Sequence, residues 1–202
     1  MTTTESSPPA DADLLATGVA WDLDPLVDGR GSDGVAALMR EATEIVERLV
    51  EYRGRIAELD AAQLAEVMAL LGEMNDRLGR AGSFVSLRFS VDTADPELGA
   101  AMQRFQEQAT ALSTQVIFLE LEWAEVDEAT ATRLVREPVL AFCRYYLESA
   151  RRYRPHLLTE AEERILAEKD ITGSSAWSRL FDELTSAIVI DLPLSLIHIS
   201  EP

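Results

Sequence analysis

Cysteine, lysine and histidine are nearly absent from this chain of 202 residues. The single cysteine, Cys143, excludes an internal disulfide and fits a reducing compartment. No histidine lies near it in the sequence, so we interpret Cys143 as a small buried hydrophobe; the alternative is a nucleophile. With Lys169 as the one lysine, positive charge comes almost wholly from arginine.

Negative charge dominates the composition. The chain has 36 acidic and 18 basic residues, which leaves a formal charge of −18. Such a charge repels phosphate backbones and anionic lipid head groups, so we expect neither nucleic acid nor a membrane as a partner.

Long apolar runs and a signal peptide are also missing. No stretch of 18 apolar residues occurs, and the first residues lack a basic segment followed by an apolar one. Residues 1–13, MTTTESSPPADAD, offer nothing to bury, and we expect them to form a flexible tail. These absences predict a cytoplasmic protein.

Catalytic motifs are missing as well. The chain contains no Gly-rich phosphate loop, no Cys-x-x-Cys pair, no Gly-x-Ser-x-Gly elbow and no His-Glu-x-x-His helix. The two histidines, His156 and His198, stand in unrelated contexts and lack the spacing of a zinc site. We therefore assign no catalytic and no metal-ligating residue, and the substrate-binding residues remain unknown.

Pairs of neighbouring acidic residues are the remaining candidates for acid–base chemistry. Glu120 with Glu122, and Glu162 with Glu163, could each act as an acid and a base. In so acidic a chain, we interpret both pairs as solvated helix faces.

What the chain does contain is a repeated helical pattern. Apolar residues recur every three or four positions through residues 35–50, 64–85 and 98–123, which is typical of amphipathic helices. The second and third stripes are joined by a short connection and predict an antiparallel helical hairpin. For the first helix we expect Ser32 or Asp33 as the N-cap, and for the third helix Asp95. The segments together predict an all-α antiparallel bundle.

A further helix is predicted for residues 137–154, with Pro138 in its first turn. Its end carries Arg151, Arg152 and Arg154. We interpret this cluster as positive charge that complements a solvated helix C-terminus. The alternative is a cluster that holds a substrate carboxylate.

The next helix opens with a capping box, in which Thr159 is followed three residues later by Glu162. We expect Ile165 and Leu166 of this helix to point inward. After a turn, residues 176–188 place four apolar side chains on one face of another helix. These side chains are Trp177, Leu180, Phe181 and Leu184.

The composition changes at AIVIDLP, where β-branched residues predict the start of a truncated β-strand near residues 187–192. We therefore expect a helical domain over residues 14–193. Residues 194–202, LSLIHISEP, resemble a translated transposon mosaic end from a sequencing library, and we interpret them as a non-native artefact that removes His198 from consideration. The alternative is an authentic exposed strand.

The stretch RPHLLTEAEERILAEKDITGSSAWSRLFDELTSAI, residues 154–188, resembles the amino-terminal part of oligoendopeptidase F and related thimet-oligopeptidase-like zinc metallopeptidases. That family shows a Leu-Ser/Thr-Glu-x-Glu-Glu turn, then Gly-x-x-Ala-Trp and a Leu-Phe or Leu-Tyr pair. The matching residues are Leu158, Thr159, Glu160, Glu162, Glu163, Gly173, Ala176, Trp177, Leu180 and Phe181. The segments WDLDPL and SVDTADPE are also similar to the family, so the resemblance runs through residues 20–193.

The resemblance implies a large helical metallopeptidase that encloses a deep channel, with the amino-terminal helices as one wall and short peptides as substrates. In that family two histidines of a His-Glu-x-x-His helix and a downstream glutamate hold zinc, and the motif glutamate activates the metal-bound water. None of these ligands matches a residue of this sequence, and the matching region would lie beyond residue 193.

The expectation from the sequence is therefore a truncated amino-terminal fragment of a zinc metalloendopeptidase. We expect the parent protein to contain zinc and the fragment to bind none, to be inactive alone and to self-associate through its uncovered surfaces. The alternative is a non-enzymatic helical scaffold that binds a protein partner.

Overall fold

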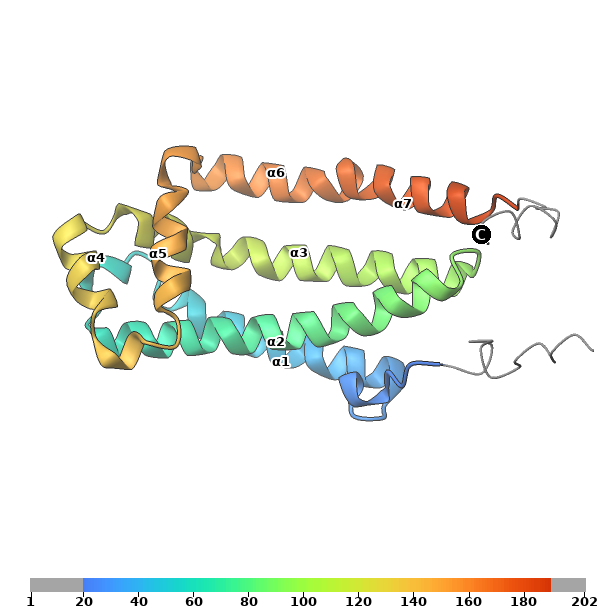
Figure 1. Ribbon diagram of the computed structural model, residues 1–202, viewed down its shortest axis with the longest axis horizontal. Helices are drawn as coiled ribbons and strands as arrows, with labels where there is room; N and C mark the ends of the chain where they lie inside the picture. Colours follow the sequence, from blue (N-terminus) through green and yellow to red (C-terminus); the bar gives the residue numbers. More distant parts are fainter. Residues whose placement is uncertain (1–19, 190–202) are drawn as a thin grey trace, which may run out of the picture.

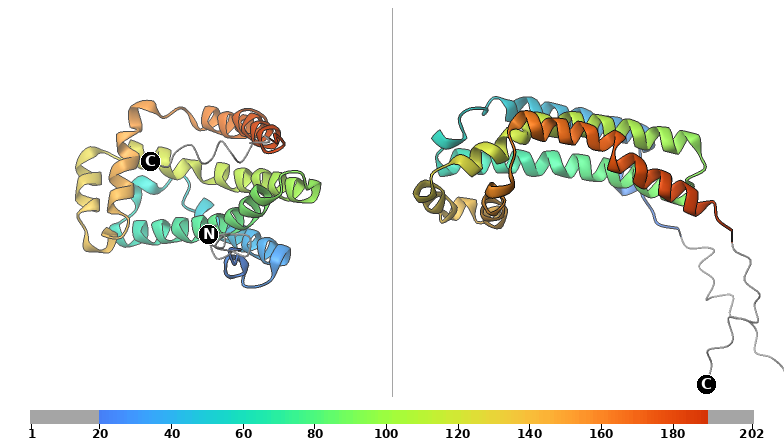
Figure 2. Two further views of the ribbon diagram at one scale, coloured as in Figure 1. Left: turned by 45° about the vertical axis from the view of Figure 1, so that its right-hand side comes forward. Right: turned by 90° about the horizontal axis from the view of Figure 1, so that it is seen from above.

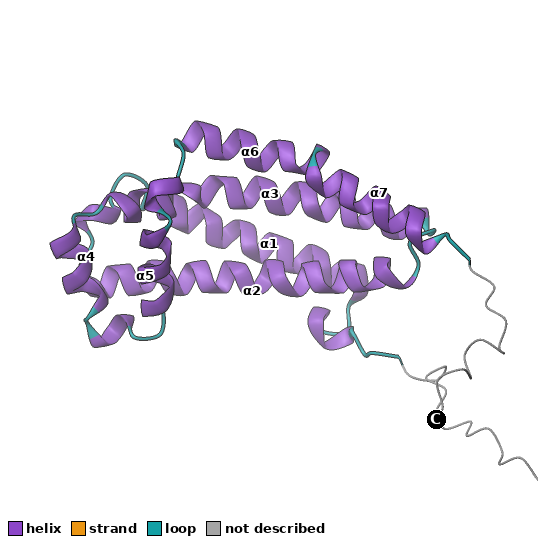
Figure 3. Cartoon of the chain, turned by 45° about the horizontal axis from the view of Figure 1, so that its top comes forward, coloured by secondary structure: helices purple, strands orange, loops and turns teal. Residues whose placement is uncertain are grey.

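The computed structural model describes residues 20–189. Three long helices lie side by side, two shorter ones cross one end of the bundle, and a final pair runs along the outside of α3 (Figure 1). In chain order the α-helices are α1 (Gly31–Val50), α2 (Ala61–Val91), α3 (Pro96–Glu125), α4 (Glu128–Val135), α5 (Arg144–Arg152), α6 (Glu160–Thr172) and α7 (Ser174–Ser186). A short 3₁₀ helix precedes α1, and three others lie between α-helices: η3 (Asp24–Val27), then η4 (Ile56–Glu58), η5 (Pro138–Leu140) and η6 (Arg154–His156). The described residues contain helices and turns without a strand (Figure 3), which confirms the all-α prediction.

The predicted hairpin is formed by α2 and α3, which are joined by a short turn and pack against each other and against α1 (Figure 2). Their apolar stripes meet in one continuous core. Each large side chain buried there contributes on the order of 1.5–3 kcal/mol through loss of apolar surface from water. The largest side chains of this core with almost no exposure are Trp123, Phe118, Leu38, Leu49, Ile56, Leu64, Leu140 and Leu147.

Two N-caps were predicted for helices of this bundle, and the structure contains one of them. The Asp95 side chain accepts hydrogen bonds from the first turn of α3, and Pro96 is the first residue of that helix, as predicted. The prediction of Ser32 or Asp33 as the cap of α1 is wrong, because that helix already begins at Gly31 and has no side-chain cap. Both residues therefore lie within the first turn, where the backbone is already helical.

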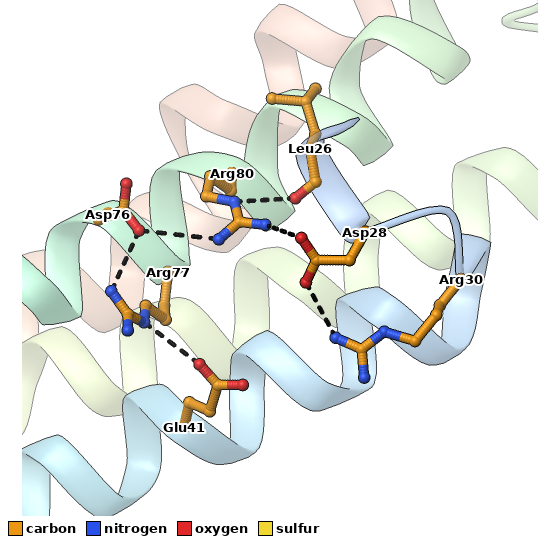
Figure 4. A network of polar contacts seen from close by, with 7 residues as sticks. All are labelled: Leu26, Asp28, Arg30, Glu41, Asp76, Arg77 and Arg80. Carbon is orange, nitrogen blue, oxygen red and sulfur yellow. Dashed lines mark hydrogen bonds and ion pairs between the residues drawn. The ribbon is translucent and has the colours of Figure 1, made fainter. Parts of the chain in front are cut away.

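The start of α1 is held instead by contacts with the preceding segment. The guanidinium of Arg80, on α2, donates to the carbonyl oxygen of Leu26 (3.0 Å) and to the Asp28 carboxylate (2.8 Å) (Figure 4). Arg30 donates to the other oxygen of Asp28 at 3.1 Å. This network fixes η3, the segment before α1, against partners about fifty residues away in sequence.

The helix predicted for residues 137–154 is divided in two. Pro138 opens η5, and the amide of Ala141 donates to the Pro138 carbonyl (3.1 Å) with the three-residue spacing of a 3₁₀ turn. At Cys143 the φ angle is −116°, outside the helical range, and α5 begins at the next residue. The prediction of one continuous helix is therefore wrong in this detail.

The last described residues test only part of the predicted strand at 187–192. Helix α7 ends at Ser186, residue 187 lies in a turn, and residues 188–189 have no regular structure. Residues 190–192 lie outside the described residues, as do the predicted tail at 1–13 and the predicted artefact at 194–202. Among residues 20–189, no helix combines the length and apolar character needed to cross a membrane.

Candidate functional site

The segment that carries the family resemblance forms α6 and α7. The capping box predicted for α6 is present, because the Glu162 amide donates to the Thr159 hydroxyl (3.4 Å) and the Thr159 amide donates to the Glu162 carboxylate (2.9 Å). Glu163 accepts a hydrogen bond from the amide of Leu158 at 3.0 Å. Hydrogen bonds from Thr159 lower the pKa of Glu162 below its ordinary value. These acidic residues therefore fix the turn that precedes α6.

The apolar face of this helical pair is largely uncovered. Ile165 and Leu166 are 57% and 56% exposed, so the prediction that they point inward is wrong. On α7, the side chains of Trp177 and Phe181 are 69% and 66% exposed, and Leu184 is also exposed. Neither helix buries a residue against the described part of the chain. The pattern of α7 is amphipathic, whereas α6 shows little amphipathic pattern; residues 20–189 supply no element that covers the exposed apolar side chains of either helix.

The start of α6 is fastened to the bundle by Arg53, which follows α1. Its guanidinium donates to the Glu160 carboxylate (2.6 Å) and to the carbonyl oxygen of Gln115 (2.9 Å). The same group lies 4.4 Å from the centre of the Phe118 ring, within the range of a cation–π contact. Glu160 belongs to the family-like motif, and its role here is to join α6 to the loop after α1.

The acidic residues Glu120 and Glu122 have different roles. The Glu122 carboxylate accepts hydrogen bonds from the amides of Gly54 (2.7 Å) and Ile56 (3.3 Å), so it fastens the turn between α1 and α2. Its interpretation as a merely solvated side chain missed this contact. Glu120 is exposed, and burial together with the charge of Glu120 raises the pKa of Tyr146 to about 12.

A cleft of about 550 Å³ lies between α4 and α5. Arginines hold the two helices together at both ends. Arg144, at the start of α5, donates through Nε to the carbonyl oxygen of Val135 at the end of α4 (2.6 Å). Arg151, near the end of α5, donates to the carboxylate of Glu128 at the start of α4 (2.9 Å). The helices are therefore antiparallel. The residues that line the cleft are Glu128, Ala131, Thr132, Val135, Arg136, Arg144, Glu148, Arg151, Arg152 and Arg154.

The arginine cluster predicted at the end of this helix is thus more than a solvated helix end. Arg151 and Arg152 do occupy the last turn of α5, where positive charge complements the helix dipole. However, the Arg151 side chain is only 11% exposed, and it also donates to the carbonyl oxygen of Trp123 at 2.8 Å. The hydrogen bond and charge of Arg151 lower the pKa of Glu128. Sequence reasoning did not find Arg136 and Arg144, which the fold brings to the same cleft.

The described residues do not fit a zinc ion. Residues 20–189 contain no group of three or more His, Cys, Asp or Glu side chains placed to hold a metal. His156 is exposed in η6, and His198 lies outside the described part of the chain. Cys143 is buried, and burial raises the pKa of its thiol, which agrees with its interpretation as a buried hydrophobe.

The α6–α7 motif lies within a segment that is similar to a known protein family. Residues 122–189, from the end of α3 to just past α7, match a family model described as Oligopeptidase F. The chain is also 27% identical over 146 residues to oligopeptidase PepF of Bacillus subtilis (strain 168). The two matches support an oligoendopeptidase F-like amino-terminal region, and the resemblance drawn from the sequence is confirmed.

The extent of these matches is partial. The alignment with the Bacillus subtilis protein covers 71% of this chain and 21% of that relative, so the chain spans about a fifth of the relative's length. The family match includes the whole motif block from Leu158 to Phe181, whereas WDLDPL and SVDTADPE lie outside it. No solved structure gives a significant match to the chain.

Proposed function

We propose that this chain is the amino-terminal helical wall of a cytoplasmic zinc metalloendopeptidase that hydrolyses short peptides. In this proposal the zinc ligands and the catalytic glutamate belong to a part of the parent protein beyond residue 193, and the 202-residue chain alone is inactive. The observation that carries the proposal is the Oligopeptidase F match over residues 122–189, within which the motif block forms the capped helix α6 and the adjoining α7.

The uncovered face of α6 and α7 supports this role. The apolar side chains that are exposed to solvent in the described part are Ile165, Leu166, Trp177, Phe181 and Leu184. Leaving such a face in water costs roughly 25 cal/mol per Å² of apolar surface, relative to burying it. We propose that the catalytic part of the parent protein packs here. The α1–α3 bundle, which has its own core, is the support that positions the face.

The proposal is tested on the native gene and on two proteins. Genomic DNA read downstream of codon 193 should encode a His-Glu-x-x-His motif, and its absence would overturn the family role. The product of that longer frame should cleave short quenched peptides, and a chelator should abolish the cleavage. The 202-residue chain, assayed with zinc under the same conditions, should give no hydrolysis above a blank without protein. Chelator-sensitive cleavage by this chain would contradict its inactivity.

A non-enzymatic scaffold is the second candidate, and the continuous core shared by α1, α2 and α3 favours it. A bundle with its own core can fold and bind a protein partner without any catalytic part. The two candidates differ in their solution behaviour. A monomeric chain with one cooperative unfolding transition and a specific protein partner, from a gene that lacks the zinc motif, would support the scaffold.

A further inference from the structure

We propose that the cleft between α4 and α5 binds a carboxylate of a short peptide. The identification of the ligand as a peptide rests on the proposed peptidase function. The observation behind it is the convergence of five arginines from the end of α4, from α5 and from η6 on one cleft.

The charge of this cleft is opposite to that of the chain. Five arginines and two glutamates line it, a formal charge of +3 in a protein with a formal charge of −18. One arginine, Arg151, is neutralised by Glu128. Within residues 20–189, Arg136, Arg152 and Arg154 have no carboxylate within 4.0 Å. These three exposed guanidinium groups are therefore free to pair with an anion that enters the cleft.

The remaining walls suit a small organic anion. Ala131 and Val135 are buried apolar residues of α4, and the half-buried Thr132 adds a hydroxyl between them. An apolar wall excludes water and strengthens a nearby charge-assisted hydrogen bond. The cleft volume lies within the range of about 300–1,000 Å³ that is typical of small-ligand sites.

Two of the arginines are held in place before any ligand arrives. Arg144 is fixed by its bond to the Val135 carbonyl, and Arg151 by its bonds to Glu128 and to the Trp123 carbonyl. A guanidinium group presents its N–H donors in a planar fork that matches the two oxygens of a carboxylate. Fixed donors lose less conformational entropy when the ligand binds.

The negative charge of the whole chain favours binding of a small anion over a polyanion. A polyanion such as a nucleic acid would meet the strongly negative remainder of the chain, and the glutamates within the cleft limit its positive charge. A peptide with one or two carboxylates can bind through the positive charge of the cleft alone. The ligand class that fits best is a short peptide that offers its terminal carboxylate or an acidic side chain.

The test is binding of an unlabelled Ala-Glu-Ala tripeptide to the full 202-residue chain, measured by isothermal titration calorimetry at low salt. The double variant Arg152→Gln/Arg154→Gln should raise Kd at least tenfold. The matched control Arg104→Gln/Arg133→Gln removes the same charge from exposed arginines outside the cleft and should change Kd less than twofold. Circular dichroism of each variant should match the unmodified chain, because the four side chains make no ion pair within residues 20–189.

Peptide variants identify the carboxylate. Loss of binding after C-terminal amidation assigns the terminal carboxylate, whereas loss in Ala-Gln-Ala assigns the side chain; either result supports the proposal. Equal loss in the cleft and control variants, or undetectable binding of every peptide by the unmodified chain, would overturn it. This binding assay needs no catalysis. A gene without a zinc motif would refute the proposed function, but the measured binding would still stand. If the parent enzyme is active and the chain binds no peptide, only the proposed carboxylate site is refuted.

Discussion

The indole Nε1–H of Trp123 donates a hydrogen bond to the carbonyl oxygen of Leu147, with 2.8 Å between the nitrogen and oxygen atoms. Trp123 is on α3 and Leu147 on α5, and both side chains are almost fully buried. This bond joins the long hairpin to the helix that forms one side of the arginine cleft. The substitution Trp123→Phe leaves the Leu147 carbonyl without this buried donor, and we expect it to lower the free energy of unfolding by about 1–3 kcal/mol.

Chemical denaturation followed by far-UV circular dichroism measures this loss. The control is Trp177→Phe, because Trp177 is exposed and makes no buried hydrogen bond in the described chain. Its free energy of unfolding should stay within about 0.5 kcal/mol of the unmodified chain. Equal destabilisation by the two substitutions would show that the Trp123 bond has no special role.

We expect substitution by alanine to have opposite effects on stability at two glycines. A Cβ atom at Gly34 would lie 2.3 Å from the carbonyl oxygen of Val27, so Gly34→Ala must push η3 away from α1. We expect a cost of about 1–3 kcal/mol, which is typical of overpacking. At Gly72, within α2, a Cβ atom meets no other atom within 4 Å, and Gly72→Ala should stabilise the helix by about 1 kcal/mol. Melting temperatures of the two variants should therefore move in opposite directions, and a shift in the same direction would be inconsistent with this packing.

Removal of the Arg53 side chain should release α6 from the bundle. Arg53→Gln loses the ion pair with Glu160 and the contact with the Phe118 ring. Because α6 buries no residue, we expect at least fivefold faster amide hydrogen exchange in residues 160–172, with little change in α1 or α2. A smaller change is expected in α7, which has its own hydrogen bond from Arg179 to Gln103 on α3. Arg55→Gln is the control, since this exposed neighbour makes no ion pair within residues 20–189. Unchanged exchange in Arg53→Gln would mean that other contacts hold the helical pair.

The ion pair between Glu128 and Arg151 predicts a pH dependence of stability. Its hydrogen bond lowers the pKa of Glu128 in the folded protein, so the pair stabilises the fold above the ordinary glutamate pKa of about 4.3. This contribution is lost as the pH falls through the lower pKa of the folded state. Glu128→Gln should therefore reduce the free energy of unfolding at pH 7 and have a progressively smaller effect at lower pH. The effect is expected to be small, because the Glu128 side chain is largely exposed.

Denaturation of the unmodified chain and of Glu128→Gln at several values between pH 7 and pH 3 tests this sign. Glu125→Gln serves as the control, because Glu125 is exposed and has no ion-pair partner in the described chain. A Glu128→Gln effect that grows toward low pH would contradict the proposed linkage.

The uncovered face of α6 and α7 predicts self-association of the isolated chain. Light scattering after size-exclusion chromatography should show oligomers, and Trp177→Gln/Phe181→Gln should shift them toward the monomer because it removes two exposed rings. Phe142→Gln, which replaces an exposed ring before α5, should leave the distribution unchanged. A monomeric unmodified chain would refute this prediction.

Much of the fold could be predicted because its signals are local. The three-and-four spacing of apolar residues identified the hairpin of α2 and α3, and short-range hydrogen bonding placed the N-cap at Asp95 and the capping box at Thr159. The start of α1 was missed because that helix has no side-chain cap, and the contacts of Arg80 that hold the segment before it cross more than fifty positions of sequence.

The candidate site was only half visible in the sequence. Arg151, Arg152 and Arg154 stand together in the chain, whereas Arg136 and Arg144 join them only because α4 and α5 fold back on each other. The sequence also could not distinguish the uncovered side chain of Ile165 from a core side chain. The residue type is the same in both cases, and it does not state whether another element covers the side chain.

The sequence by itself determined the helical class, the starts of α3 and α6 and the family resemblance, since each depends on residues within a few positions of one another. Tertiary structure alone decided which apolar face stays uncovered, which glutamate fastens a distant turn and which arginines share a cleft. Those properties depend on distances between side chains that are far apart in the chain, and packing of the helices sets these distances.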